Sequence, residues 1–315
     1  MANPKSGWGD LLSLLKTQNF IGLWLGQLFS QGGDRFTQLM LVAFAAKQAA
    51  GSTFSLAQIL VATALPALML NPFAGAYVDR WSRKKTMIIC DIIRVGVILA
   101  FPWLAALSSS VPLYMAVFVL FAVSAFFVPA RLAIIPDLVP RSRLPQANAL
   151  FTTSGMAGSA VVILAGALLI EKFGTTKAVW VNAAFFGFSV ACIALIKIKK
   201  ESHHLNPAET TGRIFHEIVE GLLAMWRHLP TRKVIVLIGL LMAGVGATVV
   251  TGTVMIQEMF GTVTRDIGFL SLWFGVGVFA GTMLYGRWES SLSRRTTLGA
   301  AFLGTGLALG GILRC

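Results

Sequence analysis

The stretch GAYVDRWSRKK, residues 75–85, connects two long apolar blocks at residues 55–78 and 86–107. As a helix that rises about 1.5 Å per residue, each block is long enough to cross a hydrocarbon layer of roughly 30 Å. The connecting stretch carries four positive charges, on Arg80, Arg83, Lys84 and Lys85. Because clusters of Lys and Arg beside membrane spans stay on the cytoplasmic side during insertion, this stretch predicts a cytoplasmic turn between two membrane-spanning helices.

The composition of the whole chain indicates a membrane protein. Of its 315 residues, 56% are hydrophobic and 12% are charged, whereas a soluble domain carries about 25% charged residues. The mean hydropathy is +0.76. The net charge of +13 would suggest nucleic-acid binding if the basic residues formed one face, but they fall at the ends of the apolar blocks. We therefore expect contact with membrane lipids and no nucleic-acid partner.

The sequence shows no pattern typical of an enzyme, a metal site or a nucleotide site. Three cysteines lie within or at the end of apolar blocks and form no CxxC pair: Cys90, Cys192 and Cys315. His203 and His204 have no further His or Cys nearby, so we interpret them as part of a solvated loop. The glycine-rich segments 244–252 and 304–311 lie in apolar spans rather than in a βαβ unit. We expect no cofactor, metal or nucleotide, and neither an enzyme nor an ATP-driven pump.

Apolar runs broken by polar or basic residues predict nine membrane spans, and thus an all-α membrane protein. Their approximate bounds are 20–46, 55–78, 86–107, 112–135, 147–170, 178–197, 233–256, 267–288 and 297–313. Most Lys and Arg residues lie in the linkers after the second, fourth, sixth and eighth spans. These linkers and the amino terminus are therefore expected in the cytoplasm.

The chain divides into four regions: an amphipathic amino-terminal segment (1–19), a six-span half (20–197), a cytoplasmic linker (198–232) and a partial second half with three spans (233–315). In the linker, Ile214, Ile218 and Leu222 recur at helical spacing, which predicts an amphipathic helix on the membrane surface.

An internal repeat supports the division into halves. Shifting the chain by 210 residues places Asp79 on Glu289 and the basic pair at 84–85 on the basic pair at 294–295. Each copy lies between two apolar spans. The chain is therefore expected to contain two halves built on one six-span plan, as in transporters with internal repeats.

The order of residues in the opening stretch resembles a known signature. Gly75, then Asp79 and Arg80, then Arg83, Lys84 and Lys85 resemble Gly-x-x-x-Asp-Arg-x-Gly-Arg-Lys, the signature of the loop between the second and third spans of the major facilitator superfamily, with Ser82 in place of the second Gly. The resemblance implies the major facilitator fold, with twelve spans. It also implies a cytoplasmic gate in which Asp79 holds the two halves together and Arg83 reaches a carboxylate near the fourth span, for which Asp137 is the candidate.

Three further stretches resemble the macrolide-efflux and siderophore-exporter branch of this superfamily, at residues 19–36, 128–150 and 178–195. This resemblance implies a monomeric, multi-pass protein of the cytoplasmic (inner) membrane that exports an amphipathic or apolar small molecule in exchange for protons. Two alternatives stay open. One is a transporter of lysophospholipids or other lipids, and the other is a truncated, non-transporting membrane protein, because the family has three more spans beyond the ninth.

Charged residues inside the expected spans are the candidates for coupling. Asp34 lies near the middle of the first span, where a lone carboxylate costs roughly 2.5–3.5 kcal/mol to insert. It either faces the central cavity, where it takes a proton or meets a cationic substrate group, or is fixed by a neighbouring helix. Asp91 and Arg94, three residues apart in the first turns of the third span, can pair on one helix face. We expect this pair to form a secondary part of the gate.

Overall fold

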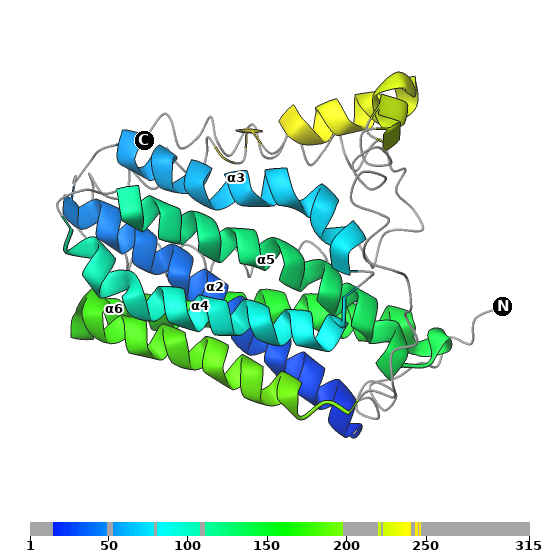
Figure 1. The fold of residues 1–315 in the computed structure, drawn as a ribbon, viewed down its shortest axis with the longest axis horizontal. Helices are drawn as coiled ribbons and strands as arrows, with labels where there is room; N and C mark the ends of the chain where they lie inside the picture. Colours follow the sequence, from blue (N-terminus) through cyan, green and yellow to red (C-terminus); the bar gives the residue numbers. More distant parts are fainter. Residues whose placement is uncertain are drawn as a thin grey trace, which may run out of the picture.

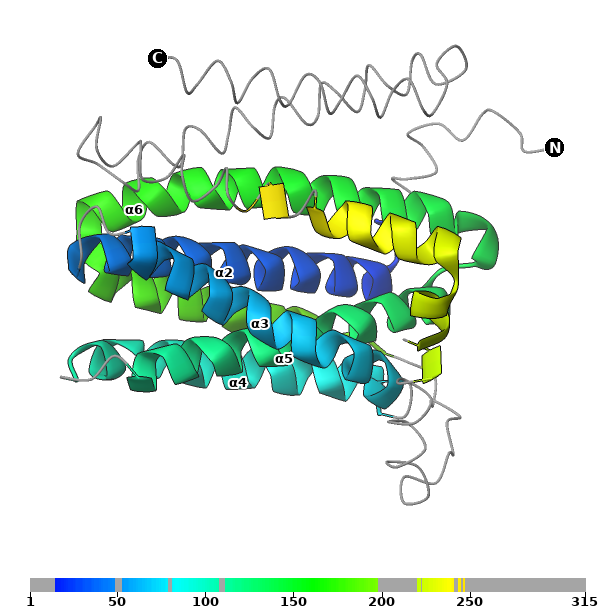
Figure 2. The same ribbon diagram turned by 90° about the horizontal axis from the view of Figure 1, so that it is seen from above.

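The computed structural model describes residues 15–48, 53–78, 81–107, 111–197, 220–221, 223–240, 243–244 and 246, and every regular element in these ranges is helical. The elements are α2 (Gln18–Gln48), α3 (Thr53–Val78), α4 (Arg83–Ala105), α5 (Val111–Leu138), a short 3-10 helix η1 (Arg141–Arg143) and α6 (Leu144–Ala194). The long helices lie side by side in one bundle, as the two views in Figure 1 and Figure 2 show.

These helices correspond to the first six expected spans. Helices α2 to α5 match the first four spans to within a few residues. Helix α6 covers the fifth and sixth spans and is interrupted at Gly174, where φ is 78° and ψ is 168°. Only glycine adopts this conformation readily, so Gly174 divides α6 into two limbs, 144–173 and 175–194.

By length and composition alone, three helical segments in the described ranges qualify as membrane-crossing helices: Arg83–Ala105, Val111–Leu138 and Arg141–Ala194. Large apolar side chains such as Leu68, Trp103 and Trp180 are exposed over 68–82% of their surface. Lipid tails are as apolar as these side chains, so such exposure is compatible with a membrane-embedded surface. Residues 1–14 of the expected amino-terminal segment 1–19, most of the linker and most of the last three spans lie outside the described residues.

Helix α2 packs mainly against α6, α3 packs against α5, and α4 contacts both α5 and α6. Glycines permit the closest of these contacts. A methyl group on Gly33 of α2 would lie 2.7 Å from Phe186 Cζ of α6, and one on Gly166 of α6 would lie 2.6 Å from Phe36 Cδ2 of α2. The two helices therefore approach each other with glycine in one and phenylalanine in the other.

Two apolar clusters fill the bundle interior. The first includes Phe36, Met40, Ile98, Phe101, Leu120 and Phe186. The second includes Phe20, Leu23, Met87, Phe127, Ile134 and Ile193. Buried polar residues of α2, α4 and the second limb of α6 include Ser30, Asp91, Arg94 and Ser189, and Arg94 contacts one phenylalanine of each cluster. The fold therefore places a polar layer between two apolar ones.

Replacing Gly33 or Gly166 with alanine should destabilise the bundle by about 1–3 kcal/mol, because the added methyl group overlaps a buried phenylalanine ring. The measurement is thermal unfolding of the purified protein in detergent. Gly187→Ala is the control, because a methyl group there meets no described atom within 4 Å while the change in helix propensity is the same. Equal unfolding temperatures for all three variants would contradict the close contact between α2 and α6.

Candidate functional site

The basic turn between α3 and α4 forms the ion pair that the sequence predicted. Arg83 Nη1 donates to Asp137 Oδ2 at 2.7 Å and to the Ala133 carbonyl oxygen at 2.8 Å, which joins the start of α4 to the end of α5. Asp79 and Arg80 lie outside the described residues. A methyl group on Gly75 would meet no described atom within 4 Å, so Gly75 makes no close helix contact with the described residues.

Lys84 makes a contact that the sequence did not suggest. Its Nζ donates to the carbonyl oxygens of Ala194 and Ile196, both at 2.7 Å, at the carboxyl end of α6. A positive charge at this end satisfies carbonyl groups that lack helical partners and interacts favourably with the helix dipole. The side-chain amide of Asn19 and the backbone of Lys197 exchange two hydrogen bonds at 2.8 and 2.9 Å. The end of α6 is therefore attached to both α2 and α4.

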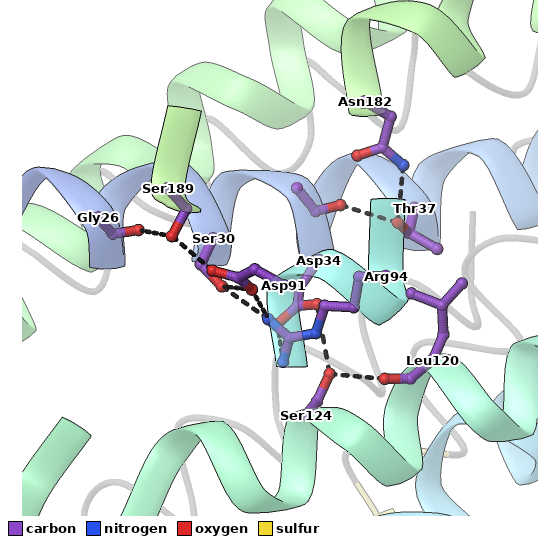
Figure 3. A network of polar contacts seen from close by, with 11 residues as sticks. Gly26, Ser30, Asp34, Thr37, Asp91, Arg94, Leu120, Ser124, Asn182 and Ser189 are labelled. Carbon is purple, nitrogen blue, oxygen red and sulfur yellow. Dashed lines mark hydrogen bonds and ion pairs between the residues drawn. The ribbon is translucent and has the colours of Figure 1, made fainter. Parts of the chain in front are cut away.

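Asp91 and Arg94 form the expected pair, but in the interior of the bundle. Arg94 Nη1 lies 2.7 Å from Asp91 Oδ1, and the two side chains are 1% and 0% exposed. Arg94 lies at the midpoint of α4, deeper than the first turns in which the sequence placed it, because α4 begins at Arg83. Two serines complete the arrangement shown in Figure 3: Ser30 Oγ of α2 contacts both residues, and Ser189 Oγ of α6 donates to Asp91 Oδ2 at 2.6 Å.

Asp34 belongs to the same cluster. Its Oδ2 lies 3.9 Å from Arg94 Nη2, its Oδ1 lies 3.4 Å from Ser124 Oγ of α5, and its side chain is 27% exposed. From the sequence we predicted separate roles for Asp34 and for the Asp91–Arg94 pair. In the structure these residues lie next to one another. We call Asp34, Asp91 and Arg94 the charged cluster.

Aromatic rings enclose the guanidinium of Arg94. Its Cζ lies 4.9 Å from the ring centre of Phe127 and 5.4 Å from that of Phe186, distances at which a ring face attracts a cation. Within the described residues, Arg94 Nε and Nη2 have no hydrogen-bond partner. The guanidinium is thus held by one close carboxylate, one serine and two rings, with Nη2 facing Asp34.

Further polar side chains continue the layer along α2. Asn182 Nδ2 of α6 donates to Thr37 Oγ1 at 2.8 Å, and Gln27 Nε2 donates to the Phe151 carbonyl oxygen at 3.3 Å. No motif in the sequence pointed to these residues or to the serines at 30, 124 and 189. Gln27, Ser30, Asp34 and Thr37 recur every three or four residues, which is the spacing of one helix face. This spacing in the sequence could have been used to predict a polar face on α2.

With both acids ionised, the charged cluster carries two negative charges and one positive charge. A net charge in a low-dielectric interior is unfavourable, so the cluster favours one additional positive charge, either a proton on a carboxylate or a cation next to it. In the part of the chain that the structure describes, no group of three His, Cys, Asp or Glu residues could hold a metal ion.

A family model described as "Major Facilitator Superfamily" matches residues 23–314. The chain is 26% identical over 268 residues to the multidrug efflux pump Tap of Mycolicibacterium fortuitum, covering 82% of this chain and 64% of that protein. It is also 26% identical over 306 residues to macrolide efflux protein A of Streptococcus pyogenes, covering 93% of this chain and 73% of that protein. The matched part thus spans about two thirds of these relatives.

Lys84→Gln should lower the stability of the bundle by about 0.3–1 kcal/mol, because it removes the positive charge at the carboxyl end of α6. Lys85→Gln is the matched control, since it removes the same charge from the neighbouring, exposed side chain. Thermal unfolding in detergent at low salt measures the difference. Equal unfolding temperatures for the two variants would show that the contact with α6 contributes nothing.

Proposed function

The chain belongs to the Major Facilitator Superfamily, a family of integral membrane transporters, and we propose that it is a secondary active transporter that exports an amphipathic or apolar small molecule by alternating access, driven by proton entry. The main support for the proposal is the charged cluster inside the helical bundle. With both acids ionised it has a net charge of −1, so one additional positive charge would neutralise it. Proton binding at this cluster would supply that charge.

Export of a small molecule is supported by the relatives, two of which are named as a multidrug and a macrolide efflux protein. A third, from Bacillus subtilis, is named as a putative bacilysin exporter and is 25% identical over 246 residues, covering 76% of this chain and 59% of that protein. None of these names refers to a lipid. We therefore prefer a small-molecule substrate to a lysophospholipid or another lipid.

In this proposal Asp34 is the residue that takes the proton. It is the more exposed carboxylate of the cluster and makes the longer contacts. Asp91 and Arg94, expected from the sequence to be a secondary part of the gate, act together with Asp34 instead, because Arg94 lies 3.9 Å from it.

The proposed gate is the basic turn at the end of the bundle that holds the Arg83–Asp137 ion pair. We place this turn and the amino terminus on the cytoplasmic side of the inner membrane, because the Lys and Arg residues of the chain concentrate there. Asp79 would then contact the second half of the transporter when the cytoplasmic side is closed. Opening towards the cytoplasm would require that contact to break.

The orientation predicts the accessibility of two positions. In a background without the native cysteines, Ser82→Cys should not react with a membrane-impermeant thiol reagent in intact cells, because it lies in the cytoplasmic turn. Thr175→Cys, beside the break in α6, should react. Permeabilised cells provide the control for reactivity. Labelling of the cysteine at 82 in intact cells would reverse the orientation.

Asp34→Asn should abolish the gradient-dependent part of transport, because an amide resembles the neutral acid and cannot exchange a proton. The measurement is export of a labelled macrolide and of a set of neutral and cationic compounds by the full-length protein, with and without a proton gradient. Binding of the compounds and abundance in the membrane should stay near the parental values. Glu171→Gln, on an exposed part of α6, is the control carboxylate.

Three results would contradict this assignment of Asp34. Full gradient-driven export by the Asp34→Asn variant would exclude it as the coupling residue. Weaker binding of cationic compounds alone would make Asp34 a substrate contact instead. Loss of abundance without a selective defect in transport would make it a structural residue.

A further inference from the structure

We infer that Asp91 is the permanent counterion of Arg94, kept ionised by Ser30 and Ser189, and that this arrangement leaves Asp34 as the one carboxyl group of the charged cluster that exchanges a proton. The inference rests on the proposed function and deepens it. It assigns Ser30, Ser189 and Asp91 as positioning residues for the guanidinium.

The two carboxylates differ in the hydrogen bonds they receive. Asp91 Oδ1 accepts from Arg94 Nη1 at 2.7 Å and from Ser30 Oγ at 3.0 Å, and its Oδ2 accepts from Ser189 Oγ at 2.6 Å. Hydrogen bonds donated to a carboxylate favour its ionised form. Asp34 lies 3.9 Å from the guanidinium, beyond hydrogen-bond distance. The ionised form is thus supported at Asp91 and poorly supported at Asp34.

The hydroxyl groups strengthen this difference, because each carries a single hydrogen. Ser189 Oγ lies 2.6 Å from Asp91 and 2.8 Å from the Gly26 carbonyl oxygen, so the nearer, charged acceptor receives the hydrogen. Ser124 Oγ lies 3.0 Å from the Leu120 carbonyl oxygen and 3.4 Å from Asp34. Its single hydrogen is shared between these two acceptors, so the hydrogen bond that Asp34 receives is longer than those that Asp91 receives.

Arg94 cannot easily leave Asp91 for Asp34. Its side chain is 1% exposed and lies between Phe127 and Phe186. Its Nη1 also donates to Ser30 Oγ at 2.7 Å, and Ser30 in turn donates to Asp91. Moving the guanidinium towards Asp34 would break these contacts within a close-packed interior.

The other groups around Asp34 do not alter the assignment. From α4 it faces Arg94 and, further away, Asp91 and the Cys90 thiol, whereas the described part of α5 contributes the uncharged Ser124. Arg35, the next residue on α2, adds a positive charge near Asp34, but within the described residues it forms no ion pair with Asp34, and its Nη1 donates to Gln38 Oε1 at 3.0 Å. Protonation forms an O–H bond at an Asp34 oxygen with a proton from hydronium, and the reverse step returns it to water. The net charge of the cluster changes from −1 to 0.

The test is a pH titration by infrared spectroscopy of the purified full chain in lipid nanodiscs, following the C=O band of protonated carboxyl groups. The difference between the parent and Asp34→Asn should isolate one titrating carboxyl group. In Asp91→Asn the band should persist but appear about one to three pH units lower, because Arg94 then has Asp34 as its remaining counterion and holds it ionised. Glu171→Gln should leave the cluster band unchanged.

A second variant keeps the charges constant. In the parental background, Ser30→Ala together with Ser189→Ala removes two donors from Asp91, so the single proton of the cluster should then be shared between Asp34 and Asp91 and a second C=O component should appear beside that of Asp34. The inference is wrong if the band persists in Asp34→Asn alone, if Asp91→Asn shows it at the parental pH or higher, or if the serine substitutions produce no second component.

The spectroscopic result is independent of transport. A chain that titrates as expected but shows no gradient-driven export would refute the proposed function and leave the roles of Asp91 and the serines intact. A chain that exports with a proton gradient but titrates at Asp91 would refute the inference alone.

Discussion

Burial of the Arg94 guanidinium is the constraint on which the middle of this bundle depends. A positive charge at the midpoint of a membrane-length helix is tolerated where a counterion and hydrogen-bond acceptors surround it. Asp91 supplies the counterion from the same helix, Ser30 supplies an acceptor from α2, and Ser189 of α6 binds the counterion in turn. Satisfying one charge thereby fixes three helices relative to one another.

The apolar clusters on either side of this layer make the arrangement specific. Each contributes one phenylalanine to Arg94, Phe186 from the first cluster and Phe127 from the second. The ring of Phe186 also packs directly against Gly33, where any side chain in place of the glycine would overlap the ring. Close packing and charge burial are therefore parts of one interface, and the depth of each helix in the bundle is set by both.

The basic turn serves two purposes with one short segment. Its positive charges favour retention of the turn in the cytoplasm during membrane insertion. This effect depends on the number of Lys and Arg residues and not on their order. Their order matters in the folded protein, where Arg83 binds the end of α5 and the next residue, Lys84, binds the end of α6. The same turn thus connects α4 to the ends of both α5 and α6.

The sequence by itself determined the approximate bounds of the helical segments α2 to α6, the basic turn, the Arg83–Asp137 pair that the family signature implied, and the Asp91–Arg94 pair. These features depend on apolar length, on local spacing or on a recognisable motif. Only the tertiary structure brought Asp34 to Arg94, 60 residues along the chain, and Ser189 to Asp91, 98 residues away. The reason is physical: helices such as α3 and α5 are mostly apolar and have no distinct polar face, and lipid is as apolar as a neighbouring helix, so the pattern of one helix does not specify its rotation or depth. Those are decided when the buried charges of different helices find their partners.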